Sequence, residues 1–471
     1  MLVLCFRRKG EGRIMDRRDF LRISGLGPAG IALALDSLNP GSAAAFDTKA
    51  DVELRIAPLS VEIGPGKTIR TTAYNGSVPG PVLRFQEGKT VTVDVYNDTD
   101  VPEVVHWHGQ KVPSSVDGSM EEGTPAVAPR GHRRFQFKPG PSGARWYHTH
   151  SMAHADLSRA GFSGQHGFVL IEPASHPGSY DQEIPIVFHH WEPKLANMGP
   201  PDNGWEIDYD SATFNGRMLG AGEPVRVREG QRVLFRLLNA SATDEVRVAL
   251  PGHSFRVVAM DGNPVPREQT VDVVYLDIGE RVDAVVEMNR PGVWIFGSTK
   301  EDERKKGMGV VVEYAGKSGQ PQWQQLANIE RGPWDYTQFG NGGTAPEPDH
   351  TFEMKIQKIP GNRKDFNHWT INGKSFPDID RLRLEKGKRY RLFFNNDSGD
   401  IHPLHLHRHI FEITQVAGKP MAGLRKDVVS VARRNTAAVD FVADNPGLTL
   451  FHCHMQLHMD FGFMQLLEYA R

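Results

Sequence analysis

The fold is decided by a stretch that begins Asn75-Gly76-Ser77-Val78-Pro79-Gly80-Pro81 and continues through the turn Glu87-Gly88-Lys89 to the segment 91–97. Asn-Gly and Glu-Gly pairs favour turns, because glycine and asparagine tolerate the backbone angles that turns require. The segment 91–97 reads Val-Thr-Val-Asp-Val-Tyr-Asn, and this alternation of apolar and polar residues is typical of a half-buried antiparallel strand. The stretch therefore predicts two turns that lead into a β-strand.

The same phrase occurs twice more along the chain. Its further copies are Asn215-Gly216 with Glu229-Gly230-Gln231 and the strand 233–239, and Asn372-Gly373 with Glu385-Lys386-Gly387-Lys388 and the strand 390–396. Chance recurrence of common turns is the alternative, but each copy has the same strand context. No long segment between residues 51 and 471 has the 3.6-residue period of a helix. We therefore expect an all-β protein built from three Greek-key β-sandwich domains.

The predicted domain boundaries follow the repeats and the stretches rich in polar residues, proline and glycine between them. We expect a signal peptide over 1–45, a first domain over 46–178, a second over 179–318, a linker over 319–350 and a third domain over 351–471. The second domain carries no cluster of histidines, and we expect it to act as a spacer.

Composition narrows the possible functions. A formal net charge of -2 disfavours nucleic acid as a partner. No segment supplies the roughly 20 apolar residues of a membrane-spanning helix. Of the 2 cysteines, Cys5 lies in the predicted leader, so Cys453 alone remains and no intrachain disulfide can form. We expect a soluble monomer.

The N-terminal region resembles a twin-arginine export signal. It contains Arg17-Arg18-Asp19-Phe20-Leu21-Arg22, a weakly apolar run, and then Gly41-Ser42-Ala43-Ala44-Ala45. Translation could start at Met1 or at Met15, and cleavage is expected near Ala45. We therefore expect a periplasmic or secreted protein.

Histidines gather in four clusters, all in the first and third repeats. Residues i and i+2 of a strand point to the same face, so each His-X-His pair offers two imidazoles to one site. The pairs are His106 with His108, His148 with His150, His405 with His407, and His452 with His454. Eight imidazoles are too many for one metal ion.

Cys453 lies between two of these histidines and must point to the opposite face of the strand. With His402 and His458 it completes a set of one thiolate and two imidazoles, which is the ligand pattern of blue copper. Zinc is the alternative, although structural zinc sites usually have four ligands and often several cysteines.

With the motifs HWHG, HTH, HPLHLH and HCHMQLH in this order, the chain resembles a three-domain multicopper oxidase of the laccase type. The resemblance covers nearly all of the predicted mature chain. It implies cupredoxin-like domains and four copper ions: one type 1, one type 2 and two type 3. It assigns type 1 copper to His402, Cys453 and His458, and type 2 copper to His106 and His405. It assigns the type 3 pair to His108, His148, His150, His407, His452 and His454.

The resemblance also implies the reaction and two further roles. One-electron donors would be oxidised at type 1 copper, and four electrons would reduce dioxygen to two waters at the trinuclear cluster. Asp117 resembles the acidic proton relay of the family, and Asp460 is the other candidate. Phe463 takes the position of the axial neighbour of type 1 copper, with Met464 one residue away. Because phenylalanine cannot bind the metal, we expect a high reduction potential.

Several alternatives remain open from sequence. The donor could be a phenol or aromatic amine, or a metal ion such as Cu(I), Fe(II) or Mn(II). A copper-binding scaffold without catalysis is a third possibility, although all the ligands are present. Arg408 replaces a glycine that is usual in the family, and we expect the following His409 to be structural.

Overall fold

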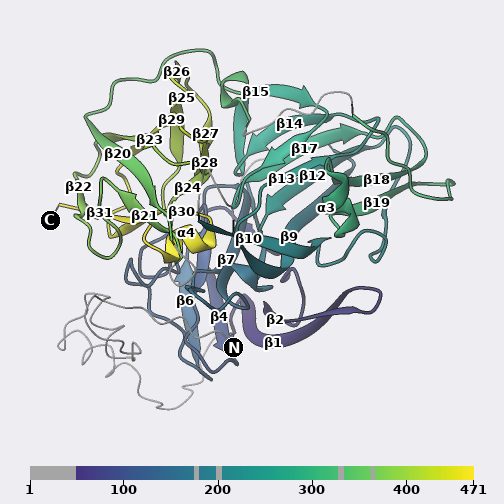
Figure 1. The fold of residues 1–471 in the computed structure, drawn as a ribbon, viewed down its shortest axis with the longest axis horizontal. Helices are drawn as coiled ribbons and strands as arrows, with labels where there is room; N and C mark the ends of the chain where they lie inside the picture. Colours follow the sequence, from purple (N-terminus) through teal and green to yellow (C-terminus); the bar gives the residue numbers. More distant parts are fainter. Residues whose placement is uncertain (1–48, 174–179, 198–203, 327–333, 362–365, 471) are drawn as a thin grey trace.

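The computed structural model describes residues 49–173, 180–197, 204–326, 334–361 and 366–470. Strands dominate this part of the chain, so the predicted all-β class is confirmed. The strands form six sheets, two in each of three consecutive units, which Figure 1 shows in purple to blue, in teal, and in green to yellow. The predicted signal peptide, 1–45, lies outside the described residues.

The first unit has one sheet in the order β2-β1-β4-β6 and another in the order β3-β8-β7-β5. Its elements are β1 (Val52–Gly64), β2 (Lys67–Tyr74), β3 (Leu83–Gln86), β4 (Val91–Asn97), β5 (Val105–His108), β6 (His132–Phe137), β7 (Gly143–Thr149), the 3-10 helix η1 (Ala160–Phe162) and β8 (His166–Glu172).

The second unit has sheets in the orders β10-β9-β12-β17-β14-β15 and β11-β19-β18-β13-β16. Its elements are β9 (Gln182–Asn197), β10 (Trp205–Phe214), β11 (Val225–Val227), β12 (Arg232–Asn239), β13 (Val246–Ala249), β14 (Phe255–Met260), β15 (Asn263–Val271), β16 (Val274–Leu276), β17 (Arg281–Glu287), β18 (Val293–Ser298), α3 (Glu301–Lys305) and β19 (Gly309–Tyr314).

The third unit has sheets in the orders β21-β20-β23-β29-β25-β26, with β27 also on β25, and β22-β31-β30-β24-β28. Its elements are the 3-10 helix η2 (Tyr336–Gln338), β20 (His350–Ile359), β21 (His368–Ile371), β22 (Leu382–Leu384), β23 (Arg389–Asn396), β24 (His402–Leu406), β25 (Phe411–Val416), β26 (Lys419–Pro420), β27 (Arg425–Lys426), β28 (Val428–Val431), β29 (Thr436–Val442), β30 (Thr449–Cys453), α4 (Gln456–Asp460) and β31 (Met464–Tyr469).

The repeated Asn-Gly phrase forms the same turn in all three units. Asn75, Asn215 and Asn372 have φ of 51°, 49° and 52°, a left-handed conformation that asparagine tolerates better than most residues. In each unit the asparagine side chain accepts a hydrogen bond from one backbone N–H of the first strand and donates one to a carbonyl of that strand. The turn is therefore fixed to the same neighbouring strand each time.

The strand after each Glu-Gly or Glu-Lys-Gly turn lies inside a mixed sheet. β4, β12 and β23 each pair antiparallel on one side, as the alternation predicts, but each pairs parallel with the first strand of its unit on the other. The prediction of purely antiparallel pairing was therefore wrong on one edge. Alternation shows how apolar a strand's faces are and does not give the direction of its neighbours.

The apolar core is continuous across unit boundaries. One buried cluster contains residues of both the second and third units, including Phe235 and Phe394, while the first unit has a separate cluster around Val93 and Trp107. Tyr336 and Phe339, inside the predicted linker, are buried in the shared cluster. None of the described helices is long and apolar enough to cross a membrane.

Candidate metal centre

Three side chains that could hold a metal ion converge at the end of β30. Cys453 Sγ lies 3.6 Å from His402 Nδ1 and 3.5 Å from His458 Nδ1, and the two imidazole nitrogens are 3.2 Å apart. His402 opens β24, and His458 comes from the short helix α4 that follows β30. Such separations fit ligand atoms that share one ion at about 2.0 to 2.3 Å. One thiol and two imidazoles also fit copper by their chemistry.

Aromatic residues enclose this three-residue site. The Trp369 ring stacks on His458 with centroids 3.8 Å apart, and the Phe463 ring lies 4.9 Å from that of His402. Phe463 shares the core cluster of Cys453, whereas Met464 packs on another cluster with Leu450. The structure therefore places Phe463, rather than Met464, beside the site.

Eight histidines form a second, larger group between the first and third units. β5 pairs with β7, which sets His106 opposite His148, and β24 pairs with β30, which sets His405 opposite His452. The second histidine of the pairs on β7, β24 and β30 lies one residue beyond the end of its strand, at His150, His407 and His454. Two strand pairs, one from each unit, thus contribute four histidines each.

The imidazole nitrogens of this group approach one another closely. His452 Nε2 lies 3.0 Å from His407 Nε2 and 3.4 Å from His150 Nε2. His148 Nε2 lies 3.4 Å from His108 Nδ1. Several sets of three histidines have nitrogens close enough to hold a metal ion. Every histidine of the group is buried except His454, which is partly buried.

Backbone carbonyls orient four of these eight rings, those of His106, His148, His405 and His452. His106 Nδ1 donates to Asp117 O at 2.8 Å, and His405 Nδ1 donates to Asp427 O at 2.7 Å. Since a carbonyl can only accept, Nδ1 carries the proton and Nε2 is left with a lone pair. The Nε2 atoms of His106 and His405 are buried without a hydrogen-bond partner, which is what a metal ligand requires.

Burial keeps these side chains in the neutral form. It lowers the pKa of His402 and His407 to about 4, and that of His454 to about 3. Neutral imidazole has the free lone pair that binds metal. Burial also raises the pKa of the Cys453 thiol, so metal binding there must release a proton.

Models of the family described as multicopper oxidase match the chain over residues 56–176, 188–314 and 345–470. These matches take in both histidine-bearing units and the unit between them. The chain belongs to the multicopper oxidase family. It is therefore a copper-dependent oxidoreductase, and the site residues described above suit that metal.

Individual relatives span nearly all of this multicopper oxidase. It is 28% identical to the multicopper oxidase MmcO of Mycobacterium tuberculosis, over 98% of each chain, and 26% identical to Laccase-2 of Podospora anserina, over 86% of this chain and 76% of that one. Its fold is similar to the crystal structure of a multicopper oxidase from Pseudomonas thermotolerans, with a TM-score of 0.70, 26% identity and coverage of 90% and 100% of the two chains.

Two buried carboxylates of the oxidase lie beside the histidine group. Asp117 Oδ2 accepts a hydrogen bond from His407 Nδ1 at 2.8 Å and lies 3.2 Å from His106 Nδ1. Glu122 Oε2 lies 3.5 Å from His407 Nδ1, and burial together with the charge of Asp117 raises the pKa of Glu122 well above its usual range. No sequence motif marks Glu122, which lies in a turn outside the strands.

The other candidate acid, Asp460, has a different environment. Its Oδ2 accepts from the backbone N–H groups of Ala153 and His154, and its Oδ1 accepts from Gln456 Nε2. These bonds tie helix α4 of the third unit to the loop after β7. Asp460 thus fixes the relative position of helix α4, which carries His458, and the loop that follows His150.

Arg408 and His409 form hydrogen bonds that stabilise the fold and do not point to the metal-binding groups. The buried Arg408 guanidinium donates to four backbone carbonyls and to Thr449 Oγ1. His409 Nδ1 donates to the carbonyl of His407, and its Nε2 lies 2.8 Å from Tyr469 Oη. Both ring nitrogens of His409 are therefore engaged away from the metal-binding groups.

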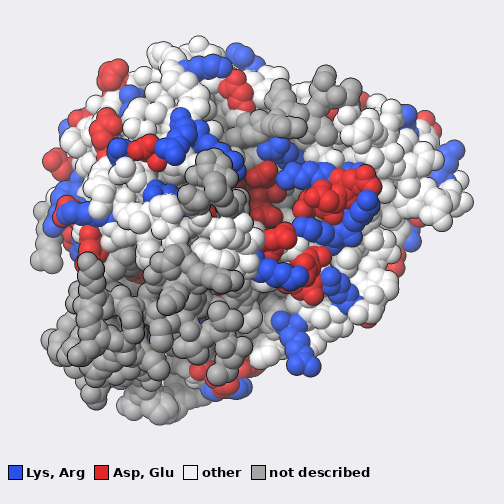
Figure 2. All heavy atoms as spheres, viewed as in Figure 1, with Lys and Arg blue, Asp and Glu red and all other residues white. Residues whose placement is uncertain are grey.

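The outer side of the Cys453 site carries charged groups. Glu206 Oε2, on β10 of the second unit, lies 3.9 Å from His458 Nε2, and Lys358 Nζ lies between Glu206 and Asp400 at 3.5 and 3.1 Å. Burial and the neighbouring Asp400 raise the pKa of Glu206 to about 8. Figure 2 shows acidic side chains near the centre of the face in view and to its right, with basic ones beside them.

Proposed function

We propose that this oxidase binds about four copper ions per chain. His402, Cys453 and His458 form the type 1 site, and His106 and His405, whose Nε2 atoms are buried without partners, form the type 2 site. The type 3 pair is held by the remaining histidines of the larger group: His108, His148, His150, His407, His452 and His454.

We also propose a laccase-like reaction, in which phenols or aromatic amines each lose one electron. Bound copper would supply the redox chemistry: one-electron oxidation of the donor at the site of His402, Cys453 and His458, and reduction of dioxygen at the site of the eight histidines. Four electrons and four protons convert one dioxygen into two waters. The observation that carries this proposal is the position of Cys453, which faces one group of ligands while its covalent neighbours His452 and His454 face the other.

The chain's own residues would have three tasks in this reaction. The peptide from Cys453 to its two neighbours joins the sites through covalent bonds. Seven of the eight histidines are buried, all except His454, and these surroundings keep bulk water out. Asp117, hydrogen-bonded to His407, is placed to hold and pass on protons, and Glu122 beside it offers a second carrier.

A second candidate is the oxidation of a metal ion, and one observation favours it. The carboxyl groups of Glu206 and Asp400 lie near His458 of the Cys453 site, and above about pH 8, where Glu206 is ionised, the pair exceeds the single charge of Lys358 and would attract a cation such as Fe(II) or Cu(I). Above about pH 8, Glu206→Gln should then raise KM for the metal ion several-fold without changing KM for a phenol. Glu353→Gln, exposed on β20, is the matched control.

The location and assembly of the protein are also proposals. The arginine pair Arg17-Arg18 and the following small residues support export by the twin-arginine route to the periplasm or medium. The described residues bring both ligand groups together within one chain, which supports a monomer.

Oxygen uptake with defined donors tests the proposed function. Purified, copper-loaded protein should consume oxygen with a phenol, and Cys453→Ser should lose both the intense visible absorption and the uptake. Faster uptake with Fe(II) or Cu(I) than with phenols would favour the second candidate. Uptake that survives Cys453→Ser would refute the proposed role of this residue.

A further inference from the structure

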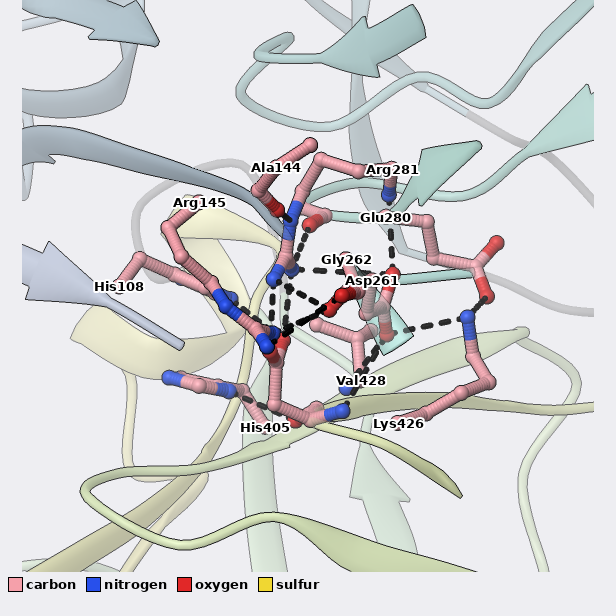
Figure 3. Close-up of polar contacts among 12 residues, drawn as sticks. His108, Ala144, Arg145, Asp261, Gly262, Glu280, Arg281, His405, Lys426 and Val428 are labelled. Atoms are coloured by element: carbon pink, nitrogen blue, oxygen red, sulfur yellow. Dashed lines mark hydrogen bonds and ion pairs between the residues drawn. The ribbon is translucent and has the colours of Figure 1, made fainter. Parts of the chain in front are cut away.

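The side chain of Asp427 lies where the three units meet. Figure 3 shows this junction, with His108 of the first unit, Arg281 of the second and His405 of the third. Asp427 itself belongs to the third unit, between β27 and β28. Its Oδ1 accepts from His108 Nε2 of the first unit at 3.0 Å. The Arg281 guanidinium, from the start of β17 in the second unit, donates to both carboxylate oxygens at 2.6 Å each.

The contact with Asp427 determines which nitrogen His108 can offer to a metal. Because a carboxylate accepts from His108 Nε2, that nitrogen carries the proton and Nδ1 keeps the lone pair. Nδ1 lies 3.4 Å from His148 Nε2, inside the histidine group. His108 is thus turned in the opposite sense to His106 and His405, which are held through Nδ1.

Asp427 also anchors a second ring through its backbone. Its carbonyl accepts from His405 Nδ1 at 2.7 Å, and the His405 ring stacks on that of His108 with centroids 3.8 Å apart. One residue therefore orients a histidine from each of the two ligand-bearing units.

Asp261 holds Asp427 and Arg281 in this arrangement. Its Oδ2 accepts from the backbone N–H groups of Asp427 and Val428 at 3.3 and 3.0 Å, and its Oδ1 accepts from the backbone N–H of Arg281 at 2.9 Å. Lys426 Nζ lies 3.0 Å from both Asp261 and Glu280. The backbone that carries Asp427 is thus tied to the second unit.

The buried charges in this network balance. Three acidic side chains and three basic ones share the junction: Asp261, Glu280, Asp427, Arg145, Arg281 and Lys426. Removal of one partner from such a network leaves a buried charge without compensation, which is costly. The junction is also tightly packed beside Gly109. A Cβ at this position would lie 2.5 Å from Asp427 Oδ2 and 2.6 Å from Arg281 Nη2, so a larger residue would displace these side chains.

We propose that Asp427 and Arg281 are positioning residues for the histidine group, so that the second unit is required for copper binding at His108. The proposal rests on the copper sites proposed above. Under this proposal the second unit is more than the spacer expected from sequence, because Arg281, whose guanidinium holds the Asp427 carboxylate, belongs to the second unit.

Copper retention by matched variants tests this proposal. Asp427→Ala and Arg281→Gln should bind the copper held by His108 about 10- to 100-fold more weakly, which is the usual effect of losing such a contact. The visible absorption of the Cys453 site should persist, because neither residue contacts that site. Asp427→Asn should lose less copper than Asp427→Ala, since its amide oxygen can still accept from His108.

Asp440→Asn is the matched control, because Asp440 is also a buried carboxylate paired with two arginines, Arg389 and Arg391, but lies away from the ligands. Equal copper retention in Asp427→Ala, Arg281→Gln and this control would overturn the proposal. If Arg281→Gln does not fold, the two Asp427 variants carry the test.

A crystal structure of metal-free Asp427→Ala separates this proposal from the proposed function. We expect the His108 ring to leave the position that it has in the metal-free wild type, and an unchanged ring would overturn the proposal. Failure of the wild type itself to bind copper would instead refute the proposed copper sites.

Discussion

At the scale of single residues, the phenyl ring of Phe463 sets the environment of the Cys453 site. It lies 4.9 Å from the His402 ring and is fully buried, so the position supplies no ligand atom. A thioether at such a position is a weak axial ligand that stabilises oxidised copper. Its absence favours the reduced form.

Phe463→Met should therefore lower the reduction potential of type 1 copper. The new thioether would stabilise the oxidised ion, and methionine fits the space of phenylalanine without a large change in volume. A redox titration followed by the visible absorption measures the shift. A potential equal to or above that of the wild type would show that residue 463 does not face the metal.

Asp117→Asn should slow oxygen reduction about 100-fold or more while copper stays bound. The amide oxygen can still accept from His407 Nδ1, but the amide cannot carry a proton. Anaerobic bleaching of the visible absorption by a donor should keep its wild-type rate, since it needs no proton at Asp117. Oxygen uptake within a few-fold of the wild type would contradict the proposed relay.

Histidine spacing was enough to predict which side chains come together, because strand geometry puts residues i and i+2 on one face. Their roles as copper ligands stay a prediction. Asp427, Glu122 and Arg281 were not foreseen, since their contacts join segments far apart in sequence. His108 and Asp427, for example, are separated by 319 positions. A single sequence has no local pattern that marks such a pair.

At the scale of elements, each unit has a buried asparagine at the end of its central strand, and this asparagine makes the same kinds of hydrogen bond in all three units. Asn97, Asn239 and Asn396 end β4, β12 and β23, and each side chain accepts from a backbone N–H two residues on. Each also donates to two or more backbone carbonyls of neighbouring segments. The alternation predicted these strands, but the parallel neighbour on one side depends on chain crossings that alternation does not encode.

Asn396→Ala should lower the free energy of unfolding by about 3 kcal/mol, because it leaves several buried backbone groups without partners. Asn372→Gly is the control: this asparagine is exposed, and glycine tolerates its positive φ, so the expected cost is about 1 kcal/mol or less. Thermal unfolding of both variants measures the difference. Equal losses of stability in the two variants would show that the hydrogen bonds of Asn396 do not stabilise the end of β23.

At the scale of the whole molecule, the second and third units share buried polar contacts as well as apolar core. Asp277 of the second unit accepts a hydrogen bond from Ser430 Oγ of the third, and it is buried. Burial, together with the charge of Glu280, raises the pKa of Asp277 to about 7. This interface was not predictable, because the two residues meet only after both sheets have formed.

The raised pKa makes the interface sensitive to pH. Folding favours the protonated carboxyl, so this contribution to stability is complete below pH 4 and is lost as pH rises to about 7. Asp277→Asn removes the proton linkage. As pH rises from 5 to 8, the free energy of unfolding of the variant should increase by about 3 kcal/mol relative to that of the wild type. Unfolding midpoints measured across that range should diverge; parallel curves would contradict the assignment.

The most direct test of the copper assignment is the copper content of the purified mature protein, measured together with its visible spectrum. We predict about four copper ions per chain and an intense blue absorption from the Cys453 site. Little bound copper and no colour after loading would contradict the account, and would favour a scaffold that keeps the ligands without the chemistry.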